Sequence, residues 1–229
     1  MESLTKRRLD CVQLAAAVAR ALGGDVRVSA VDELPEGMFN AVYRVCLQPG
    51  DRSVVVKSSP PAQVPLLTYE RDILRTEAAF YQRASEVLGL PVPEVLAFVA
   101  DPAWLGAAFL VMSHEDGRPG GEAPALEPWV KESTAATQQR MHEGFVDMLA
   151  AVHRLDWHAA GLDGVLRGGD GALAREVAWW VDYVDWASDG LLAVALAGAI
   201  ARCARTVPKT EPPASLCWGD ARIGNVLFD

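Results

Sequence analysis

The sequence has no hydrophobic run that could cross a bilayer. Its longest uncharged apolar run, residues 190–201, has 12 residues, whereas a membrane-spanning helix needs about 20. The basic residues at positions 6–8 are followed by Asp10 and Gln13, where a secretory signal would carry an apolar core. We therefore expect a cytoplasmic protein that makes no contact with a membrane.

Basic charge is also scarce. Lys and Arg together number 21 against 30 Asp and Glu, so the net charge at pH 7 is −9. Such a chain repels a nucleic-acid backbone on average, and no basic run offsets that repulsion. We therefore expect no nucleic-acid partner, whereas a small anionic ligand needs only a few local cations.

Cysteine motifs are missing as well. None of the four cysteines belongs to a C-x-x-C pair, which argues against a zinc site and against a disulfide scaffold. We expect buried free thiols, because an unpaired cysteine packs as a small hydrophobe. The four cysteines are Cys11, Cys46, Cys203 and Cys217.

The composition that is present is typical of a globular protein of one or two domains. Hydrophobic residues make up 51% and charged residues 22% of the 229 positions. In the first half, alternating apolar residues predict strands and helical spacing predicts two helices. We expect helices over 5–22 and 66–88, and strands over 26–31, 41–47, 53–57, 95–100 and 107–113.

The second half has a different pattern. Residues 115–128 are rich in Gly and Pro and predict a linker, and helical spacing follows over 133–155 and 172–205. The chain is therefore expected to divide into a strand-rich half, 1–114, and a helix-rich half, 115–229. Three tryptophans at helical spacing are expected in the core, namely Trp179, Trp180 and Trp186.

Two charged residues interrupt apolar patterns in the first half. Lys57 ends a run of three valines, and Glu77 lies on an apolar helix face between Ile73 and Tyr81. An unpaired buried charge is costly, so the two are natural partners, although each could instead reach solvent at the edge of its element. Glu70, two turns earlier, is the alternative partner for Lys57.

An Asp and an Asn five residues apart lie near the end of the chain. Asp220 and Asn225 can converge on one point, as in the kinase catalytic loop, where Asp accepts a proton and Asn holds a divalent cation. Arg222 adds a permanent cation that could meet a transferring phosphoryl group. The pattern by itself is also compatible with an ordinary turn.

A loop between two expected strands, residues 35–40, could fold over phosphates and ends at Asn40. It holds one glycine, Gly37, rather than the three of a kinase loop. An ordinary hairpin is the alternative interpretation.

The order of these features resembles the aminoglycoside phosphotransferase and choline kinase superfamily. The resemblance implies an α+β, protein-kinase-like fold with two lobes. The N-lobe would hold an antiparallel sheet and one long helix, and the C-lobe would be mostly helical and incomplete. The matching segments are VVVK (54–57), EAAFY (77–81), LPVP (90–93), FLVM (109–112), AVH (151–153) and WGDARIGN (218–225).

The resemblance implies an enzyme that transfers the γ-phosphate of ATP to a hydroxyl of a small molecule. In the N-lobe, Lys57 would hold the α- and β-phosphates, Glu77 would orient Lys57, and the loop ending at Asn40 would cover the phosphates. Backbone groups from Met112 to His114 would meet adenine.

In the C-lobe, the resemblance makes Asp220 the catalytic base, places Arg222 beside the transferring phosphoryl group and makes Asn225 a Mg²⁺ ligand. Trp218 replaces the His that many members have there. The family's second metal-binding Asp would follow Asp229, so we expect an inactive fragment. The alternative is a pseudokinase or nucleotide-binding module without catalysis. The acceptor stays open among aminoglycosides, choline, amino-sugar and methylthioribose-type alcohols, and hydroxylated acyl thioesters.

Overall fold

The computed structural model describes residues 8–23, 25–34, 40–61, 63–64, 66–67, 70–122, 125–163, 165, 171–189, 191, 194–211 and 213–229. The chain divides into two compact units, Met1–Asp116 and Gly117–Asp229. We call them the sheet unit and the helical unit, and each is described by itself.

A five-stranded antiparallel sheet forms the sheet unit. Its strand order is β1-β2-β3-β5-β4, so the three N-terminal strands form a meander and the two later strands pair along its edge. The turn at Gly50 joins β2 to β3 with a positive φ of 85°, which glycine adopts without strain. The strands are β1 (Arg27–Leu34), β2 (Ala41–Gln48), β3 (Arg52–Ser58), β4 (Val95–Val99) and β5 (Phe109–Ser113).

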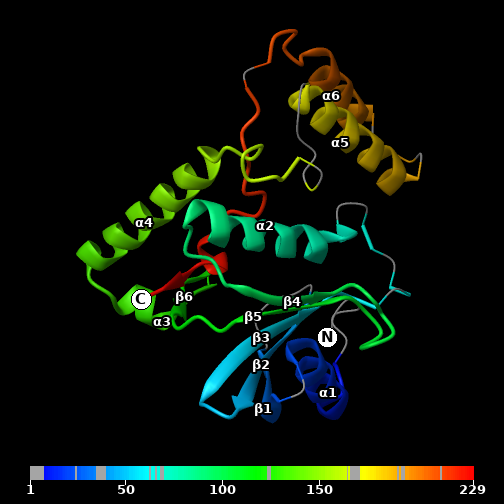
Figure 1. The fold of residues 1–229 in the computed structure, drawn as a ribbon. Coiled ribbons are helices and arrows are strands. Elements are labelled where there is room, and N and C mark those ends of the chain that lie inside the picture. The colour runs from blue at the N-terminus through cyan, green and yellow to red at the C-terminus, as the bar shows by residue number, and fades with distance from the viewer. Residues whose placement is uncertain are drawn as a thin grey trace. The chain divides into compact units, whose positions relative to one another are not determined.

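Helices cover both faces of this sheet. Successive strand residues point to opposite faces, and in β5 Phe109 and Val111 join one hydrophobic cluster while Leu110 and Met112 join another. Helix α1 (Cys11–Leu22) packs on the first face and α2 (Ile73–Leu88) on the second, as Figure 1 shows. The sheet unit therefore has three layers and two cores.

Both helices of the sheet unit begin later than the sequence predicts. Helix α1 starts at Cys11 because the Asp10 side chain accepts a hydrogen bond from the Gln13 N–H and caps the helix. Helix α2 starts at Ile73 because Asp72 adopts a left-handed conformation, with φ 55°. Of the described residues between 66 and 72, none is in an α-helix: Glu70 is in a 3₁₀ conformation, and Arg71 and Asp72 are in a turn.

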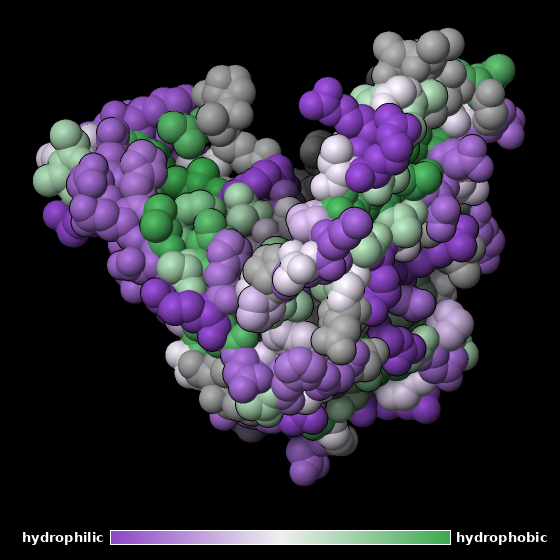
Figure 2. Space-filling view, turned by 90° about the horizontal axis from the view of Figure 1, so that it is seen from above, coloured by the Kyte–Doolittle hydropathy of each residue, from purple (hydrophilic) through white to green (hydrophobic). Residues whose placement is uncertain are grey.

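The helical unit confirms the expected helix-rich character but contains few buried side chains. Trp180 and Trp186 are 43% and 50% exposed, and α5 buries no residue completely, so the expected core position of these tryptophans is wrong. On the face of the molecule shown in Figure 2, hydrophobic residues are exposed among hydrophilic ones. The helices are α3 (Pro128–Glu132), α4 (Ala135–His153), α5 (Ala172–Ser188) and α6 (Val194–Arg205).

The expected linker instead forms short strands. β6 (Arg118–Pro119) pairs with β9 (Leu227–Phe228), near the end of the chain. β7 (Gly121–Glu122) pairs with β8 (Ala125–Leu126). The prediction of a plain linker failed because the partner of β6 lies more than a hundred residues away in the sequence.

The four cysteines are free, but their expected burial is wrong. Cys11, Cys203 and Cys217 are exposed, and Cys46 is half-buried. Within the described residues, no helix is long and apolar enough to cross a membrane.

Candidate active site

An ion pair links the sheet to helix α2. The Lys57 Nζ lies 2.7 Å from Oε1 and 2.6 Å from Oε2 of Glu77, so the ammonium bridges both carboxylate oxygens. The two side chains are only 23% and 19% exposed. Partial burial weakens screening by water and makes this contact stronger than a surface pair.

The register of the sheet explains why Lys57 meets α2. Lys57 lies opposite Leu110 of β5 and Val42 of β2. Leu110 belongs to the cluster beneath α2, and cross-strand neighbours share a face. Lys57 therefore points to the same face as Leu110, where Glu77 projects from the helix.

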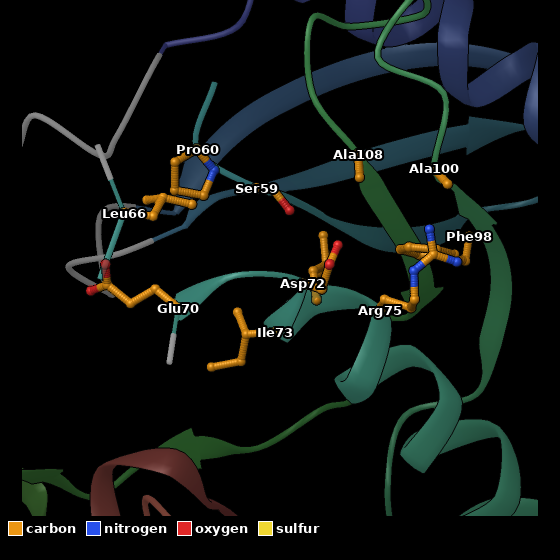
Figure 3. A pocket seen from close by; sticks show the side chains of 11 residues that line it. Ser59, Pro60, Leu66, Glu70, Asp72, Ile73, Arg75, Phe98, Ala100 and Ala108 are labelled. Atoms are coloured by element: carbon orange, nitrogen blue, oxygen red, sulfur yellow. The ribbon is translucent and has the colours of Figure 1, made fainter. Parts of the chain in front are cut away.

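The alternative partner, Glu70, is engaged elsewhere. Its carboxylate accepts a hydrogen bond of 2.8 Å from the Leu67 N–H. Glu70 also lines a pocket of about 180 Å³ at the N-terminal turn of α2, and Figure 3 shows it with Leu66 and Ile73 at one end of that pocket. Lys57 and Glu77 are not among the lining residues, so this pocket is separate from the ion pair.

Asn40 is a buried polar residue at the start of β2. It is only 8% exposed, and its Oδ1 has no hydrogen-bond partner among the described residues. A buried amide oxygen without a hydrogen-bond partner is costly. Residues 35–39 of the predicted phosphate loop lie outside the described residues, so Asn40 is the part of that loop that the structure places.

The predicted hinge lies at the end of β5. Met112 packs against the core beneath α2, and the neighbouring Ser113 N–H donates to the Glu94 carbonyl at 2.9 Å. His114 is half-buried, with Nδ1 3.9 Å from Oδ1 of Asp116. These contacts hold the segment to which the family resemblance assigns adenine, and that assignment stays a prediction.

In the helical unit, three predicted residues form one cluster. Arg222 contacts both carboxylate oxygens of Asp220. Its Nη2 donates a hydrogen bond to Oδ2 at 2.8 Å, and its Nε forms an ion-pair contact of 2.7 Å with Oδ1. The Asn225 Nδ2 donates to the Asp220 carbonyl at 2.9 Å and to its Oδ2 at 3.0 Å. The five-residue spacing becomes a closed loop because Ile223–Asn225 form one turn of 3₁₀ helix.

The cluster lowers the pKa of Asp220. Burial alone would raise the pKa of this carboxyl, but the hydrogen bonds from Arg222 and Asn225 and the positive charge of Arg222 outweigh it. Asp220 is therefore a carboxylate at neutral pH and can accept a proton.

Two aromatic side chains, one from α4 and one from the turn after it, hold the chain just before Asp220. The Trp218 ring lies against Phe145 of α4, with ring centroids 6.0 Å apart. Upstream, the Trp157 Nε1 donates to the Ala214 carbonyl at 3.4 Å. Sequence reasoning assigned neither contact, because nothing in the local pattern pairs residues this far apart.

Glycines let the segment 117–121, which we call the strap, lie directly against residues 223–228. A Cβ on Gly117 would lie 2.9 Å from the Leu227 Cβ, and one on Gly120 would lie 3.2 Å from Ile223 and Phe228 side-chain atoms. Larger residues would push the strap away. The signal in the sequence was the glycine enrichment that we assigned to a linker.

The structure thus brings the predicted residues together in two groups. Lys57 and Glu77 meet in the sheet unit, and Asp220, Arg222 and Asn225 meet in the helical unit. Among the described residues, no cluster of three or more His, Cys, Asp or Glu side chains could hold a metal ion. The Asn225 amide directs its nitrogen to Asp220, which leaves the amide oxygen as a hard ligand of the kind Mg²⁺ prefers.

Comparison with known proteins adds a family match. The model of the phosphotransferase enzyme family matches residues 31–229. Acyl-CoA dehydrogenase family member 11 of Gallus gallus is 28% identical over 200 residues, which cover 87% of this chain and 24% of that protein. Its Rattus norvegicus counterpart is 28% identical over 234 residues, which cover 100% of this chain and 28% of that protein. The chain spans about a quarter of the length of these relatives.

A solved structure shares the fold. The crystal structure of a candidate aminoglycoside phosphotransferase from Ralstonia eutropha matches with a TM-score of 0.67 at 20% identity, over 96% of this chain and 61% of that chain. This likeness establishes the kinase-like phosphotransferase fold that the sequence predicts.

Proposed function

The chain belongs to the phosphotransferase enzyme family, and we propose that its site serves the transfer of the γ-phosphoryl group of ATP to a hydroxyl of a small molecule. The expected inactivity of residues 1–229 stays a prediction, and the transfer assay below tests it. The observation that carries this proposal is the half-buried ion pair of Lys57 and Glu77. A lysine held at a fixed point by a carboxylate is the group that kinase-like enzymes use on nucleotide phosphates.

In the sheet unit, we assign the nucleotide to the α2-facing side of β3. Lys57 offers its ammonium to the α- and β-phosphates, and Glu77 keeps that ammonium in place. The buried Asn40 Oδ1, which has no hydrogen-bond partner among the described residues, supports a polar ligand, because a hydroxyl or amino donor of the nucleotide would give it one. Backbone groups from Met112 to His114 would receive adenine.

In the helical unit, Asp220 accepts the proton of the acceptor hydroxyl as the hydroxyl oxygen attacks the γ-phosphorus. The bond from that phosphorus to the β,γ-bridging oxygen breaks, and ADP leaves. Arg222 is long and permanently charged, so it can stabilise the phosphoryl group in transfer. The Asn225 amide oxygen is the group in this cluster that fits Mg²⁺. When bound, the ion neutralises charge on the phosphates.

For the acceptor, we favour a hydroxylated acyl thioester over the other alcohols that the family phosphorylates. The support is the name that the matched relatives carry, acyl-CoA dehydrogenase family member 11. A hydroxyacyl-CoA should therefore be a better acceptor than choline or an aminoglycoside.

The exposed free thiols of Cys11, Cys203 and Cys217 suit a reducing compartment. We propose that the protein works in the cytoplasm, where ATP is available.

Nucleotide binding is the first test. Lys57→Met should weaken ADP affinity about tenfold or more in calorimetry, because a hydrogen bond to a charged group is lost. Lys131→Met, which changes an exposed lysine on α3, is the matched control and should leave the affinity unchanged. Equal affinities in all three proteins would remove the basis of the proposal.

Transfer is the second test. The chain is incubated with γ-³²P-ATP, Mg²⁺ and a hydroxyacyl-CoA, with choline and an aminoglycoside as comparison acceptors. Asp220→Asn should abolish transfer and leave ADP affinity within about twofold, because the base acts in the chemical step. ADP binding that is indifferent to Mg²⁺, without transfer to any acceptor, would support a nucleotide-binding module instead.

A further inference from the structure

Glu77 has a second partner on its own helix. Tyr81 lies four residues after Glu77 on α2, so the two side chains occupy the same helix face. The Glu77 carboxylate receives the Lys57 ammonium, and its negative charge also acts on the Tyr81 hydroxyl. The carboxylate therefore lies between the Lys57 ammonium from the sheet and the Tyr81 side chain one turn along its own helix.

The Tyr81 ring is fixed by packing. It contacts the cluster of Leu74, Ala78 and Leu110 that joins α2 to the sheet, and its ring centroid lies 6.2 Å from that of Phe80. A side chain held in this way places its hydroxyl at one point. The hydroxyl can then select one orientation of Glu77 from the several that an unconstrained carboxylate would visit.

The hydroxyl also stays protonated. Burial, and secondly the negative charge of Glu77, raise the pKa of Tyr81 well above its usual range. The Tyr81 hydroxyl is therefore neutral at physiological pH and is able to donate a hydrogen bond. A neutral hydroxyl can hydrogen-bond the Glu77 carboxylate and leave the charge balance of the Lys57–Glu77 ion pair unchanged.

We propose that Tyr81 is a positioning residue that holds the Glu77 carboxylate toward Lys57 and thereby fixes the lysine for the nucleotide. This inference rests on the proposed nucleotide-binding function of Lys57. It assigns to α2 a three-membered chain from Tyr81 through Glu77 to Lys57, in which the tyrosine acts only through the carboxylate.

The first test compares two tyrosines that each lose one hydroxyl. Tyr81→Phe should weaken ADP affinity about three- to tenfold. Tyr43→Phe is the matched control, because Tyr43 is 2% exposed and its hydroxyl accepts a hydrogen bond from the Leu9 N–H in the other core. The control should lower the thermal midpoint and leave ADP affinity unchanged. Equal ADP affinities in wild type and Tyr81→Phe would overturn the inference.

A second test needs no nucleotide. The reactivity of Lys57 toward an amine reagent is measured by mass spectrometry, with the exposed Lys131 and Lys209 as references within the same chain. Tyr81→Phe should speed Lys57 labelling about two- to fivefold, because a less constrained Glu77 shields the amine less well, and Tyr43→Phe should not. Unchanged labelling would overturn the positioning role even if the nucleotide proposal held.

Failure of the proposed function gives a different result. If wild type failed to bind ADP while Tyr81→Phe still speeded Lys57 labelling, the chain of three residues would stand and its nucleotide role would fall. Should Tyr81→Phe not fold by circular dichroism, 3-fluorotyrosine placed at this position keeps the ring and strengthens the donor. Labelling of Lys57 should then be slower than in wild type, and faster labelling would contradict the proposal.

Discussion

At the level of single residues, Lys57 and Asp220 meet different electrostatic surroundings. Lys57 and Glu77 are largely covered, whereas the side chains of Asp220 and Arg222 are 64% and 41% exposed. Water screens the second pair far more than the first. We therefore expect the Lys57 pair to matter for structure and binding, and the Asp220 pair mainly to set protonation.

Protonation of Asp220 gives a pH prediction. The folded pKa lies below the ordinary value of 3.8, so the contribution of this carboxylate to stability is complete above 3.8 and is lost as the pH falls through the folded pKa. Arg222→Gln removes the charge and should move the midpoint upward, toward 3.8.

The measurement is carboxyl ¹³C NMR of the aspartate-labelled chain, titrated without added metal. Asn225→Ala removes the other side-chain donor and should move the midpoint in the same direction. A midpoint that did not change in Arg222→Gln would show that the guanidinium does not hold this carboxylate in solution.

At the level of elements, the strap gives a prediction about glycine. Gly117→Ala should lower the free energy of unfolding, because its φ of 152° is unfavourable for alanine and the new Cβ would meet Leu227 at 2.9 Å. We expect a loss of about 1–3 kcal/mol, measured by urea denaturation.

The matched control is Gly144→Ala within α4, where a Cβ meets nothing within 4 Å. This change should raise the free energy of unfolding by about 0.5–1 kcal/mol, because alanine favours the helix. Both substitutions add one methyl group, so effects of opposite sign on the free energy of unfolding would locate the destabilisation in the strap. A neutral Gly117→Ala would contradict the close packing on β9.

Elements with a clear period were predictable, and elements that depend on distant partners were not. The five strands follow from alternation and valine runs, and the partnership of Lys57 with Glu77 follows from charges inside apolar patterns. The start of α2 did not follow, because the left-handed Asp72 carries no sequence signal that distinguishes it from a helical residue. The pairing of β6 with β9 depends on closure of a long loop, which local periodicity does not encode.

The candidate site was predictable as residue types but not as contacts. The kinase order identified Asp220 and Asn225. The contacts of the Arg222 guanidinium with both carboxylate oxygens of Asp220 appear only in three dimensions. Tyr81 looked like one more apolar contact of its helix, because a tyrosine on an apolar face has the same spacing whether or not its hydroxyl has a partner. The exposure of Trp186 was missed for a related reason, since spacing identifies a face and not what covers it.

At the level of the whole molecule, buried hydrophobic residues are unevenly distributed. The sheet unit contains both hydrophobic clusters. Among the described residues, the helical unit buries few hydrophobic side chains, namely Val130, Met141, Val152, Trp157, Ala160, Leu162 and Leu216. Because burial of apolar surface is the main stabilising term, the helical unit should be the less stable of the two.

This imbalance predicts two unfolding steps. In a urea series followed by hydrogen exchange and mass spectrometry, amides of α4, α5 and α6 should lose protection at lower urea than those of β1–β5. Saturating ADP should raise the urea midpoint of the sheet unit and leave that of the helical unit nearly unchanged, because the proposed nucleotide contacts of Lys57 lie in the sheet unit. A single coincident loss of protection would show that the units unfold together.

The two-sided sheet also limits which changes in length the gene can accept. Phe109 and Val111 of β5 serve one core while Leu110 and Met112 serve the other, so deleting or inserting a single codon within this strand would exchange the two sets. In β3 the same slip would turn Lys57 away from Glu77 and into the core of α1. A point substitution in these strands changes the packing of one core only. A frame-preserving insertion of one residue would disrupt both cores and the ion pair together.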